Sequence, residues 1–263
     1  MGLLDGHRGL VVGIANERSI AHGIARAARA QGATLALTYQ SERLLKRVGP
    51  IAEELGCDIC LPCDLTDPAQ LAEVGETLAQ QWGSLDFVVH AVAYAKREEL
   101  EGRFIDTSRD GFVMALEVSV YTLVSLARVL EPLLAKSTHA PSVLTLTYYG
   151  SEKAMPNYNV MGVAKAALEA SVRYMASELG PAGIRVNALS AGPIKTLSAA
   201  GVSGLRRMLG MMEAHAPLRR NVTIEDVGDA ALYALSYLGR GMTGEVFHVD
   251  AGYHVLGALR EDV

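Results

Sequence analysis

The chain has 263 residues, half of them hydrophobic and a fifth charged, with a net charge of −5 at pH 7. This composition is typical of a soluble globular protein, and the acidic balance argues against a nucleic-acid-binding surface. No uninterrupted run of about 18 apolar residues would span a bilayer, and residues 1–6 lack the basic and apolar regions of a signal peptide. We therefore expect one cytoplasmic α/β domain over residues 1–263, without nucleic-acid or membrane partners.

Short apolar runs alternate along the chain with longer amphipathic segments. The runs predict strands at 9–14, 33–39, 57–62, 85–91, 142–147, 184–190 and 244–250. The segments predict helices at 20–31, 41–55, 68–82, 106–136, 156–179 and 223–238. Strands that alternate with helices imply right-handed crossovers. We predict a doubly wound, Rossmann-like, seven-stranded parallel sheet with helices on both faces.

The first strand–turn–helix has features of a dinucleotide-binding turn. Gly13 permits a tight turn, Ser19 is a candidate N-cap, and Gly23 would let the helix pack closely on the strand. The N–H groups of the first helical turn would then be offered to a pyrophosphate. The Gly-x9-Gly spacing is less specific than Gly-x-Gly-x-x-Gly, so an ordinary turn is the alternative.

The end of the second predicted strand bears on cofactor choice. An acid there would hold a ribose 2′-hydroxyl, and a basic cluster would hold a 2′-phosphate. Gln40 can hydrogen-bond a hydroxyl but cannot neutralise a phosphate, whereas Arg43 leaves NADPH possible, so NADH is favoured. Asp64, after the third strand, either accepts a hydrogen bond from adenine or caps the helix that begins at Pro68.

The three cysteines are spaced Cys-x2-Cys-x2-Cys at positions 57, 60 and 63. This spacing is superficially that of an iron–sulfur site, but the chain has no fourth cysteine. We interpret the cysteines as reduced structural thiols and expect no metal site.

Residues 106–136 are so rich in Leu, Val and Ala that the predicted helix must be covered on more than one side, and a subunit interface is one explanation. Pro132 is expected to bend this helix near its end.

The fifth strand delivers Tyr148 to the carboxyl edge of the sheet, where ligands bind in open α/β folds. If Pro156 opens the next helix, Tyr158 and Lys165 lie about two turns apart on one face. Alone, this pair is also compatible with a half-buried Tyr and a solvated Lys. It gains meaning from the nucleotide-binding pattern upstream.

Residues 195–215 are apolar but interrupted by Gly201, Gly204 and Gly210. They form either a surface helix that completes the core or a mobile lid whose Met and Leu side chains adapt to an acyl chain.

These segments together resemble the short-chain dehydrogenase/reductase superfamily, and within it the bacterial enoyl-acyl carrier protein reductases. The general superfamily pattern is Tyr-x3-Lys, but here Met161 stands four residues before Lys165, and Tyr158 stands seven before it. The longer spacing is that of the enoyl reductases. The most specific matching segments are 13–23, 39–40, 63–64, 156–165, 185–188 and 191–194.

The resemblance implies an enzyme of fatty acid biosynthesis that uses NADH to reduce the C2=C3 bond of a trans-2-enoyl thioester on acyl carrier protein, as a homotetramer. It implies that Tyr158 hydrogen-bonds the developing enolate oxygen, that Lys165 holds the nicotinamide ribose, and that Tyr148 lines the site beside the thioester. The cofactor contacts it implies are Gly13, Ser19, Ile20, Gln40, Asp64, Leu65, Val92, Lys165, Ile194 and Thr196. The substrate contacts it implies are Ala95, Tyr148, Met161 and Leu197.

Residues 90–96 depart from the family pattern. The methyl group of Ala93 narrows a spot beside the nicotinamide, and Lys96 brings a charge to the pocket mouth, which leaves chain-length preference and inhibitor binding open. Two other functions are possible: a 3-oxoacyl or other carbonyl reductase with Ser151 as the polarising residue, or a dinucleotide-binding regulator without catalysis.

Three cations near the predicted lid, Lys195, Arg206 and Arg207, are expected to form a basic rim that attracts an acidic carrier protein. The alternative is that they are ordinary solvated surface charges.

Overall fold

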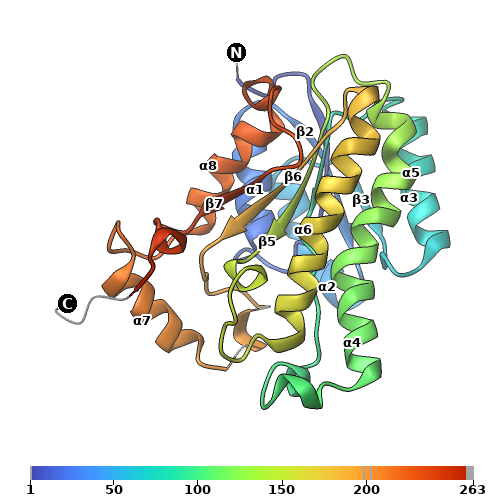
Figure 1. The fold of residues 1–263 in the computed structure, drawn as a ribbon. Helices are drawn as coiled ribbons and strands as arrows, with labels where there is room; N and C mark the ends of the chain where they lie inside the picture. Colours follow the sequence, from blue (N-terminus) through green and yellow to red (C-terminus); the bar gives the residue numbers. More distant parts are fainter. Residues whose placement is uncertain (1, 198, 202, 259–263) are drawn as a thin grey trace.

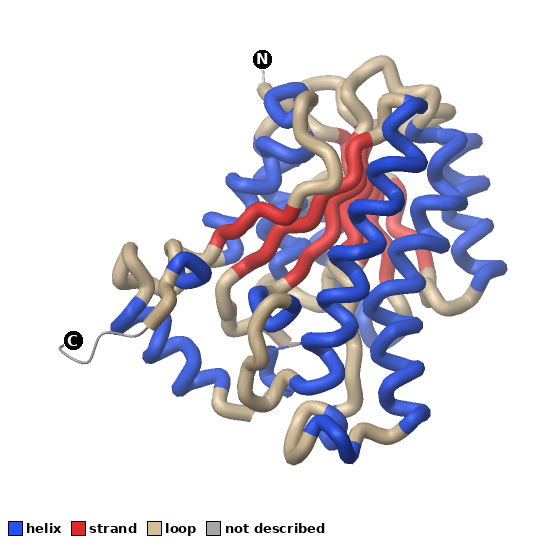
Figure 2. The backbone as a smooth tube through the Cα atoms, in the orientation of Figure 1, coloured by secondary structure: helices blue, strands red, loops and turns tan. Residues whose placement is uncertain are grey.

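The computed structural model describes residues 2–197, 199–201 and 203–258. Seven strands form one parallel sheet in the order β3-β2-β1-β4-β5-β6-β7 (Figures 1 and 2). The strands are β1 (Arg8–Val12), β2 (Thr34–Tyr39), β3 (Ile59–Pro62), β4 (Phe87–His90), β5 (Ser142–Thr147), β6 (Arg185–Ala191) and β7 (Val246–Val249). The predicted doubly wound, seven-stranded parallel fold is confirmed.

Helices cover both faces of this sheet (Figure 1). One core holds Val11, Phe87 and Val89 of the strands together with α1 (Ile20–Ala30), α2 (Glu42–Glu54) and α8 (Ile224–Leu235). The other holds Leu10 and Val88 with α3 (Pro68–Gln81), α5 (Thr122–Leu134) and α6 (Asn159–Leu179). Consecutive strand residues therefore face opposite cores, and the central strands are largely apolar because both of their faces are buried.

The remaining elements lie near the carboxyl ends of the strands or join the main elements. α4 (Arg109–Leu116) precedes α5, and α7 (Leu205–His215) lies beyond β6, beside the end of the described chain (Figure 1). The short 3₁₀ turns are η1 (Arg97–Glu99), η2 (Phe104–Asp106), η4 (Tyr149–Ser151), η5 (Gly180–Ala182), η6 (Ala199–Gly201), η7 (Tyr237–Gly239) and η8 (Tyr253–Val255).

The order of the strands reverses at β1, which lies between β2 and β4. Gly13, just past β1, has a φ of 104°, and a Cβ there would lie 2.2 Å from the carbonyl oxygen of Ala91. Only glycine fits so close to the end of β4. A crevice at such a reversal is where doubly wound sheets bind ligands.

The start of α6 differs from its prediction. The helix begins at Asn159 rather than Pro156, so Tyr158 occupies the N-cap position and lies just outside the helix. Asn157 and Asn159 have φ values of 59° and 33°, outside the right-handed helical region, so a regular helix cannot run from Pro156 through Asn157, and Asn159 is an irregular first residue of α6. Asn adopts positive φ more readily than most residues. Tyr158 therefore reaches the site from the loop before α6, and Lys165 reaches it from the helix.

The predicted helix 106–136 begins at Arg109 and ends at Leu134. Between α4 and α5 it contains a π-helical segment, η3 (Glu117–Tyr121), which inserts extra backbone into the helix. By length and composition alone, Arg109–Leu134 could cross a membrane, although no such run was expected. Buried leucines such as Leu126 and Leu130 anchor it in the core, and core helices have the same signature.

Gly23 does not act as predicted. A Cβ at Gly23 would lie 2.3 Å from the carbonyl oxygen of Ile224, so this glycine brings α1 against α8 rather than against a strand. Thr223 begins α8 with a capping box, in which its hydroxyl accepts from the N–H of Asp226 at 3.2 Å. The Asp226 carboxylate accepts from the N–H of Thr223 at 2.9 Å.

Candidate active site

A cavity of about 520 Å³ opens beyond the carboxyl ends of β1, β4, β5 and β6. Most of the predicted site residues line it. These are Gly13, Ser19, Ile20, Val92, Ala95, Tyr148, Tyr158, Met161, Lys165, Ile194, Thr196 and Leu197. A cavity of this size is ample for part of a dinucleotide with a small acyl group.

Three predicted cofactor residues lie outside the lining of this cavity. Gln40 and Asp64 stand at the neighbouring ends of β2 and β3, where the Gln40 amide donates to the Asp64 carboxylate at 3.1 Å. The other predicted residue, Leu65, is buried in the core beside α3.

Asp64 does not cap α3, because Asp67 does, accepting from the N–H of Ala69 at 2.9 Å. The Asp64 carboxylate instead accepts from the N–H and hydroxyl of Thr66 at 3.0 and 2.8 Å. Burial acts to raise the pKa of Asp64, but these bonds and the one from Gln40 outweigh it, so the net pKa is lowered. A carboxylate is thus held at the end of β3.

Ser19 occupies the N-cap position of α1, as expected, but its hydroxyl does not cap the helix. It accepts from the N–H groups of Ala15 and Asn16 at 3.0 and 3.1 Å and so closes the turn after β1. The first turn of α1 therefore has no side-chain cap, and Ile20 and Ala21 line the cavity. Uncapped N–H groups at a helix start form a favourable site for a phosphate.

Tyr148 and Tyr158 lie together in the cavity, with ring centroids 5.0 Å apart and planes at 71°. Burial raises the pKa of both phenols above the ordinary value of 10.0, with nearby ionisable groups adding to the effect. Both hydroxyls therefore keep their protons at neutral pH and can donate hydrogen bonds.

Lys165 is buried, with a side chain that reaches the same cavity. Its Nζ donates to the carbonyl oxygen of Leu146 in β5 at 2.7 Å. Burial lowers the pKa of Lys165 from 10.5 to about 8, and the negative charge of Glu169 opposes this decrease. An ammonium group with this pKa is still largely charged at neutral pH.

Ser151, the candidate for polarising a ketone, does not line this cavity. It lies in η4 and lines a second cavity of about 390 Å³, which Tyr158 also lines. Its buried hydroxyl has no hydrogen-bond partner among the described residues. The geometry required for a carbonyl reductase is therefore missing at this serine.

His90, at the end of β4, was not among the predicted site residues. Its imidazole is completely buried and is bonded at Nδ1 to Thr145 Oγ1 (3.0 Å) and at Nε2 to Thr122 Oγ1 (2.9 Å). Burial lowers its pKa to about 3, with the charge of Lys165 contributing. His90 is thus a neutral link between β4, β5 and α5 beneath the cavity.

The loop after β4 contributes lining residues that the sequence did not suggest, Tyr94, Arg97 and Leu100. The loop is fastened to η3, because Ser119 Oγ accepts from the N–H of Tyr94 at 3.1 Å and donates to its carbonyl oxygen at 3.3 Å. The same hydroxyl lies 3.8 Å from the sulfur of Met161. The π segment therefore supports this wall of the cavity.

The predicted lid region contains η6 and α7, and its residues 198 and 202 lie outside the described residues. Met208 of α7 lines the cavity, and its sulfur lies 3.3 Å from the Tyr148 hydroxyl. The carbonyl oxygen of Ser203 accepts from the side chain of Asn157 at 2.9 Å. The described part of this segment thus lines the cavity and contacts the loop that carries Tyr158.

Among the described residues, no group of three or more His, Cys, Asp or Glu side chains could hold a metal ion. The three cysteines are free thiols. Burial raises the pKa of Cys57 and of Cys63 to about 11, so these thiols are poor nucleophiles at neutral pH.

Known proteins are similar to this chain in sequence and fold. A family model described as enoyl-(acyl carrier protein) reductase matches residues 13–254. The chain is 54% identical to enoyl-acyl-carrier-protein reductase (NADH) 1 of Rhizobium meliloti strain 1021, over 99% of this chain and 95% of that protein. It matches the enoyl reductase of Anaplasma phagocytophilum in complex with NAD at 52% identity and a TM-score of 0.94, over 98% of each chain. It matches the Bacillus cereus enoyl reductase with NADP⁺ and indole naphthyridinone at 49% identity and a TM-score of 0.95, over 98% of this chain and 100% of that one. The chain therefore belongs to the enoyl-(acyl carrier protein) reductase family.

Proposed function

We propose that this protein reduces the C2=C3 double bond of a trans-2-enoyl thioester, carried by acyl carrier protein, with hydride from NADH in fatty acid biosynthesis. The observation that carries the proposal is that Tyr148, Tyr158 and Lys165 meet in one cavity at the reversal of the sheet. The Rhizobium meliloti relative, whose name specifies NADH, supports it.

The residues around the crevice fit a dinucleotide. Gly13 leaves space where any side chain would meet the end of β4, and the first turn of α1 is free of a side-chain cap. We assign the pyrophosphate to Ser19 and Ile20, the adenosine to Gln40, Asp64 and Leu65, and the nicotinamide to the region of Val92, Ile194 and Thr196. When bound, the reduced nicotinamide supplies the hydride. Lys165 would hold the nicotinamide ribose with its ammonium group.

Tyr158 would stabilise the charge that develops during reduction. Addition of hydride to the β-carbon places negative charge on the thioester oxygen, and a protonated phenol can donate a hydrogen bond to that oxygen. Because burial keeps the pKa of Tyr158 high, the phenol remains a donor throughout the neutral range. Tyr148 would position the thioester, with Ala95, Met161 and Leu197 contacting the acyl portion.

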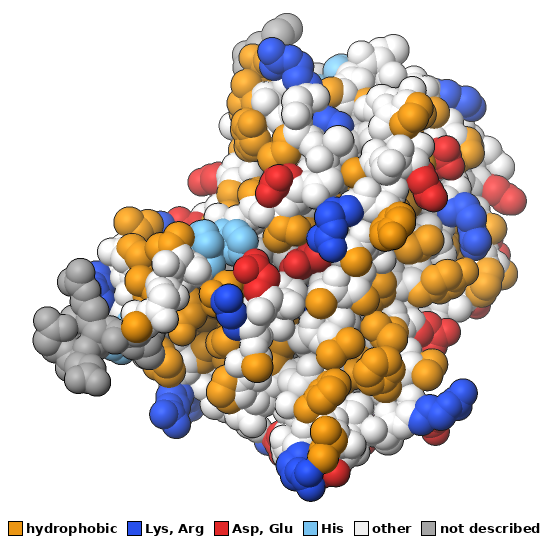
Figure 3. All heavy atoms as spheres, in the orientation of Figure 1, with side chains coloured by type: hydrophobic (Ala, Val, Ile, Leu, Met, Phe, Trp, Pro, Cys, Tyr) orange, Lys and Arg blue, Asp and Glu red, His pale blue; other side chains and the backbone are white. Residues whose placement is uncertain are grey.

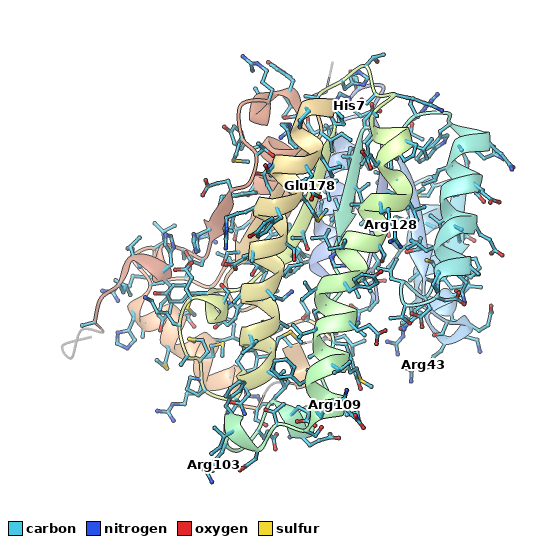
Figure 4. The ribbon with its side chains drawn as sticks, turned by 45° about the vertical axis from the view of Figure 1, so that its right-hand side comes forward. His7, Arg43, Arg103, Arg109, Arg128 and Glu178 are labelled. Carbon is cyan, nitrogen blue, oxygen red and sulfur yellow. The ribbon has the colours of Figure 1, made fainter. Side chains whose placement is uncertain are left out.

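NADH is favoured over NADPH by the carboxylate at the end of β3. Gln40 and Asp64 share a hydrogen bond there, and a 2′-phosphate would lie near a negative charge. Arg43, labelled in Figure 4 at the start of α2, is the cation that could offset this effect. Because the Bacillus cereus relative was solved with NADP⁺, the activity of this protein must be measured with both NADH and NADPH.

The test is a thioester assay with both cofactors in parallel. Purified protein with a crotonyl thioester should oxidise NADH faster than NADPH, and Tyr158→Phe should slow this reaction greatly. Absence of turnover with either cofactor across several chain lengths would overturn the proposal. Activity on 3-oxoacyl but not enoyl thioesters would favour the carbonyl reductase instead.

The carrier protein is proposed to dock near the lid, over residues 195–215. Lys195, Arg206 and Arg207 are exposed there, where positive charge would attract an acidic partner. Reversal of these three charges should raise KM for carrier-bound substrate and reduce the salt dependence of turnover. Its effect on a small crotonyl thioester should be minor. An unchanged salt dependence would remove the rim from the proposal.

A homotetramer in the cytoplasm is the proposed state. Hydrophobic side chains gather on the outer face of α4 and α6 (Figure 3), including the exposed Val113, Val163 and Tyr174. Arg128 and Glu178 lie on the neighbouring outer surfaces of α5 and α6 (Figure 4). Sedimentation analysis should give four copies, and Tyr174→Glu should weaken assembly; a monomeric parent would overturn this part.

A further inference from the structure

We infer that Glu169, held by Thr147, is a positioning residue for Lys165, and that its buried carboxylate keeps the neighbouring ammonium charged and ready to hold the cofactor. The inference rests on the proposed binding of a dinucleotide at Lys165.

Glu169 lies one helical turn after Lys165 on α6, and both side chains are buried. Glutamate is rarely buried unless a partner stabilises it, because removing a carboxylate from water is costly. A Glu–Lys pair on an exposed face of the helix would not require a carboxylate to be removed from water. The burial of Glu169 therefore calls for a specific partner.

The partner is at the end of β5. Thr147 Oγ1 donates to the Glu169 carboxylate at 2.5 Å, and Lys165 Nζ donates to the carbonyl oxygen of the preceding residue, Leu146, at 2.7 Å. Consecutive residues of one strand thus fix the carboxylate and the ammonium. The next residue in the chain is Tyr148, so the same strand end positions three of the groups that act on the site.

The two charges are close without forming a contact pair. In the described structure no nitrogen–oxygen distance of 4.0 Å or less joins Lys165 to Glu169. The ammonium therefore keeps donors for a ribose, whereas a contact ion pair would occupy them. Glu169 acts on Lys165 through its charge, because two charges in a buried site still attract each other without direct contact.

The other titratable groups around Lys165 do not supply this charge. His90, from β4, is neutral at neutral pH because burial lowers its pKa to about 3. Tyr148 and Tyr158 are neutral phenols, and Asp250, after β7, acts on Tyr148. Glu169 is the group whose charge raises the pKa of Lys165 against the effect of burial.

The test compares Glu169→Gln with Glu178→Gln, which makes the same change at an exposed position of the same helix (Figure 4). The amide at 169 can still accept from Thr147 but carries no charge. NADH affinity is measured by fluorescence titration from roughly pH 5 to 10, and the pH profile of kcat/KM is measured over the same range.

For the parent and for Glu178→Gln, affinity should decrease as the pH rises through about 8. For Glu169→Gln the same decrease should occur about one to three pH units lower, because an opposite charge has been removed. At pH values well below both midpoints the variants should converge. Glu169→Asp keeps the charge and should restore most of the parent midpoint.

Glu169→Gln could instead lose the same amount of NADH affinity at every pH, with an unchanged midpoint of the pH dependence. This result would overturn the inference and would leave Glu169 with a structural role only. If this variant does not fold, Thr147→Val should shift the midpoint in the same direction, and an unshifted midpoint would overturn it. A parent that binds NADH but does not reduce enoyl thioesters would overturn the proposed function, while the binding titration still tests Glu169. A parent that binds neither nicotinamide cofactor would overturn both.

Discussion

The ring of Tyr148 meets the ring of Tyr158 edge to face, with the centroids 5.0 Å apart. Gly150 permits this contact, because a Cβ there would lie 2.6 Å from the Tyr158 ring. The pair joins the end of β5 to the loop before α6 and directs both phenols into one cavity. The proposed reaction gives the two phenols different tasks, which substitution can separate.

Replacing Tyr158 by Phe should lower kcat by about 100-fold, because it removes one donor to the developing oxyanion. NADH affinity should stay close to that of the parent. Tyr148→Phe keeps the ring contact and should lower kcat by about 10-fold or less, with its main effect on KM for the thioester. Steady-state kinetics with a crotonyl thioester checks both values, and equal decreases in kcat would contradict the separate roles.

The activity should decrease at alkaline pH because Lys165 loses its proton there. Because burial lowers the pKa of its ammonium to about 8, against the opposing charge of Glu169, the proton is lost as the pH rises through that value. We expect kcat/KM for NADH to be level below this pH and to fall about tenfold per unit above it. The high pKa values of Tyr148 and Tyr158 keep these phenols out of that window.

Lys165→Arg provides the control, since a guanidinium group stays charged over the whole range. This variant should be less active than the parent at neutral pH, because its shape differs, but it should lack the limb near pH 8. A limb of unchanged position in Lys165→Arg would mean that another group titrates.

Gly13→Ala should strongly destabilise the protein, because it distorts the turn after β1. Its φ of 104° is unfavourable for alanine, and the new Cβ would lie 2.2 Å from the Ala91 carbonyl oxygen. We expect a loss of about 3 kcal/mol in the free energy of unfolding, together with loss of NADH binding. Gly6→Ala, with a φ of 77° and no heavy atom within 4 Å, should lose only about 1 kcal/mol. Urea denaturation measures both, and equal losses would show that the close approach to β4 is unimportant.

His90→Ala should reduce stability in a pH-dependent way. The folded protein keeps His90 neutral, with its pKa lowered from 6.5 to about 3 by burial, so below pH 6.5 the unfolded chain binds a proton that the folded chain does not. The parent should therefore lose about 1.4 kcal/mol of unfolding free energy per pH unit through this residue as the pH falls from 6.5 towards 3.

Above pH 6.5 the variant should be less stable than the parent by about 2–4 kcal/mol, because the hydroxyls of Thr122 and Thr145 each lose the hydrogen bond to the imidazole and a cavity forms. The gap should narrow on acidification. Denaturation curves at pH values between roughly 5 and 7.5 test this expectation, and a constant gap would contradict it.

Most of the sheet could be predicted because parallel strands covered on both faces require nearly continuous apolar runs. β5 occupies the predicted residues, and β3 begins at Ile59, after a predicted start at 57. The start of α6 could not be predicted, since the positive φ values of Asn157 and Asn159 depend on the tertiary packing of the loop. Pro156 was consistent with a helix start but does not require one.

The site was predictable only where it follows a motif. Tyr158 and Lys165 are separated by a characteristic spacing, so the sequence pointed to them without knowledge of their neighbours. Glu169 and His90 could not be found in this way, because the identity of a polar residue does not show whether it is buried or exposed to solvent. The bond between Gln40 and Asp64 likewise requires β2 and β3 to be neighbours, which sequence order alone does not establish.

Because of the π segment Glu117–Tyr121, the number of residues in this helix cannot change without disturbing the loop after β4. Deleting one residue there would restore a regular α-helix and also rotate α4 by about 100° relative to α5. Ser119 would then turn away from Tyr94, and the loop after β4 would lose its attachment to the helix. We expect insertions and deletions to be tolerated in exposed connections but excluded from these five residues, even though none of them lines the cavity.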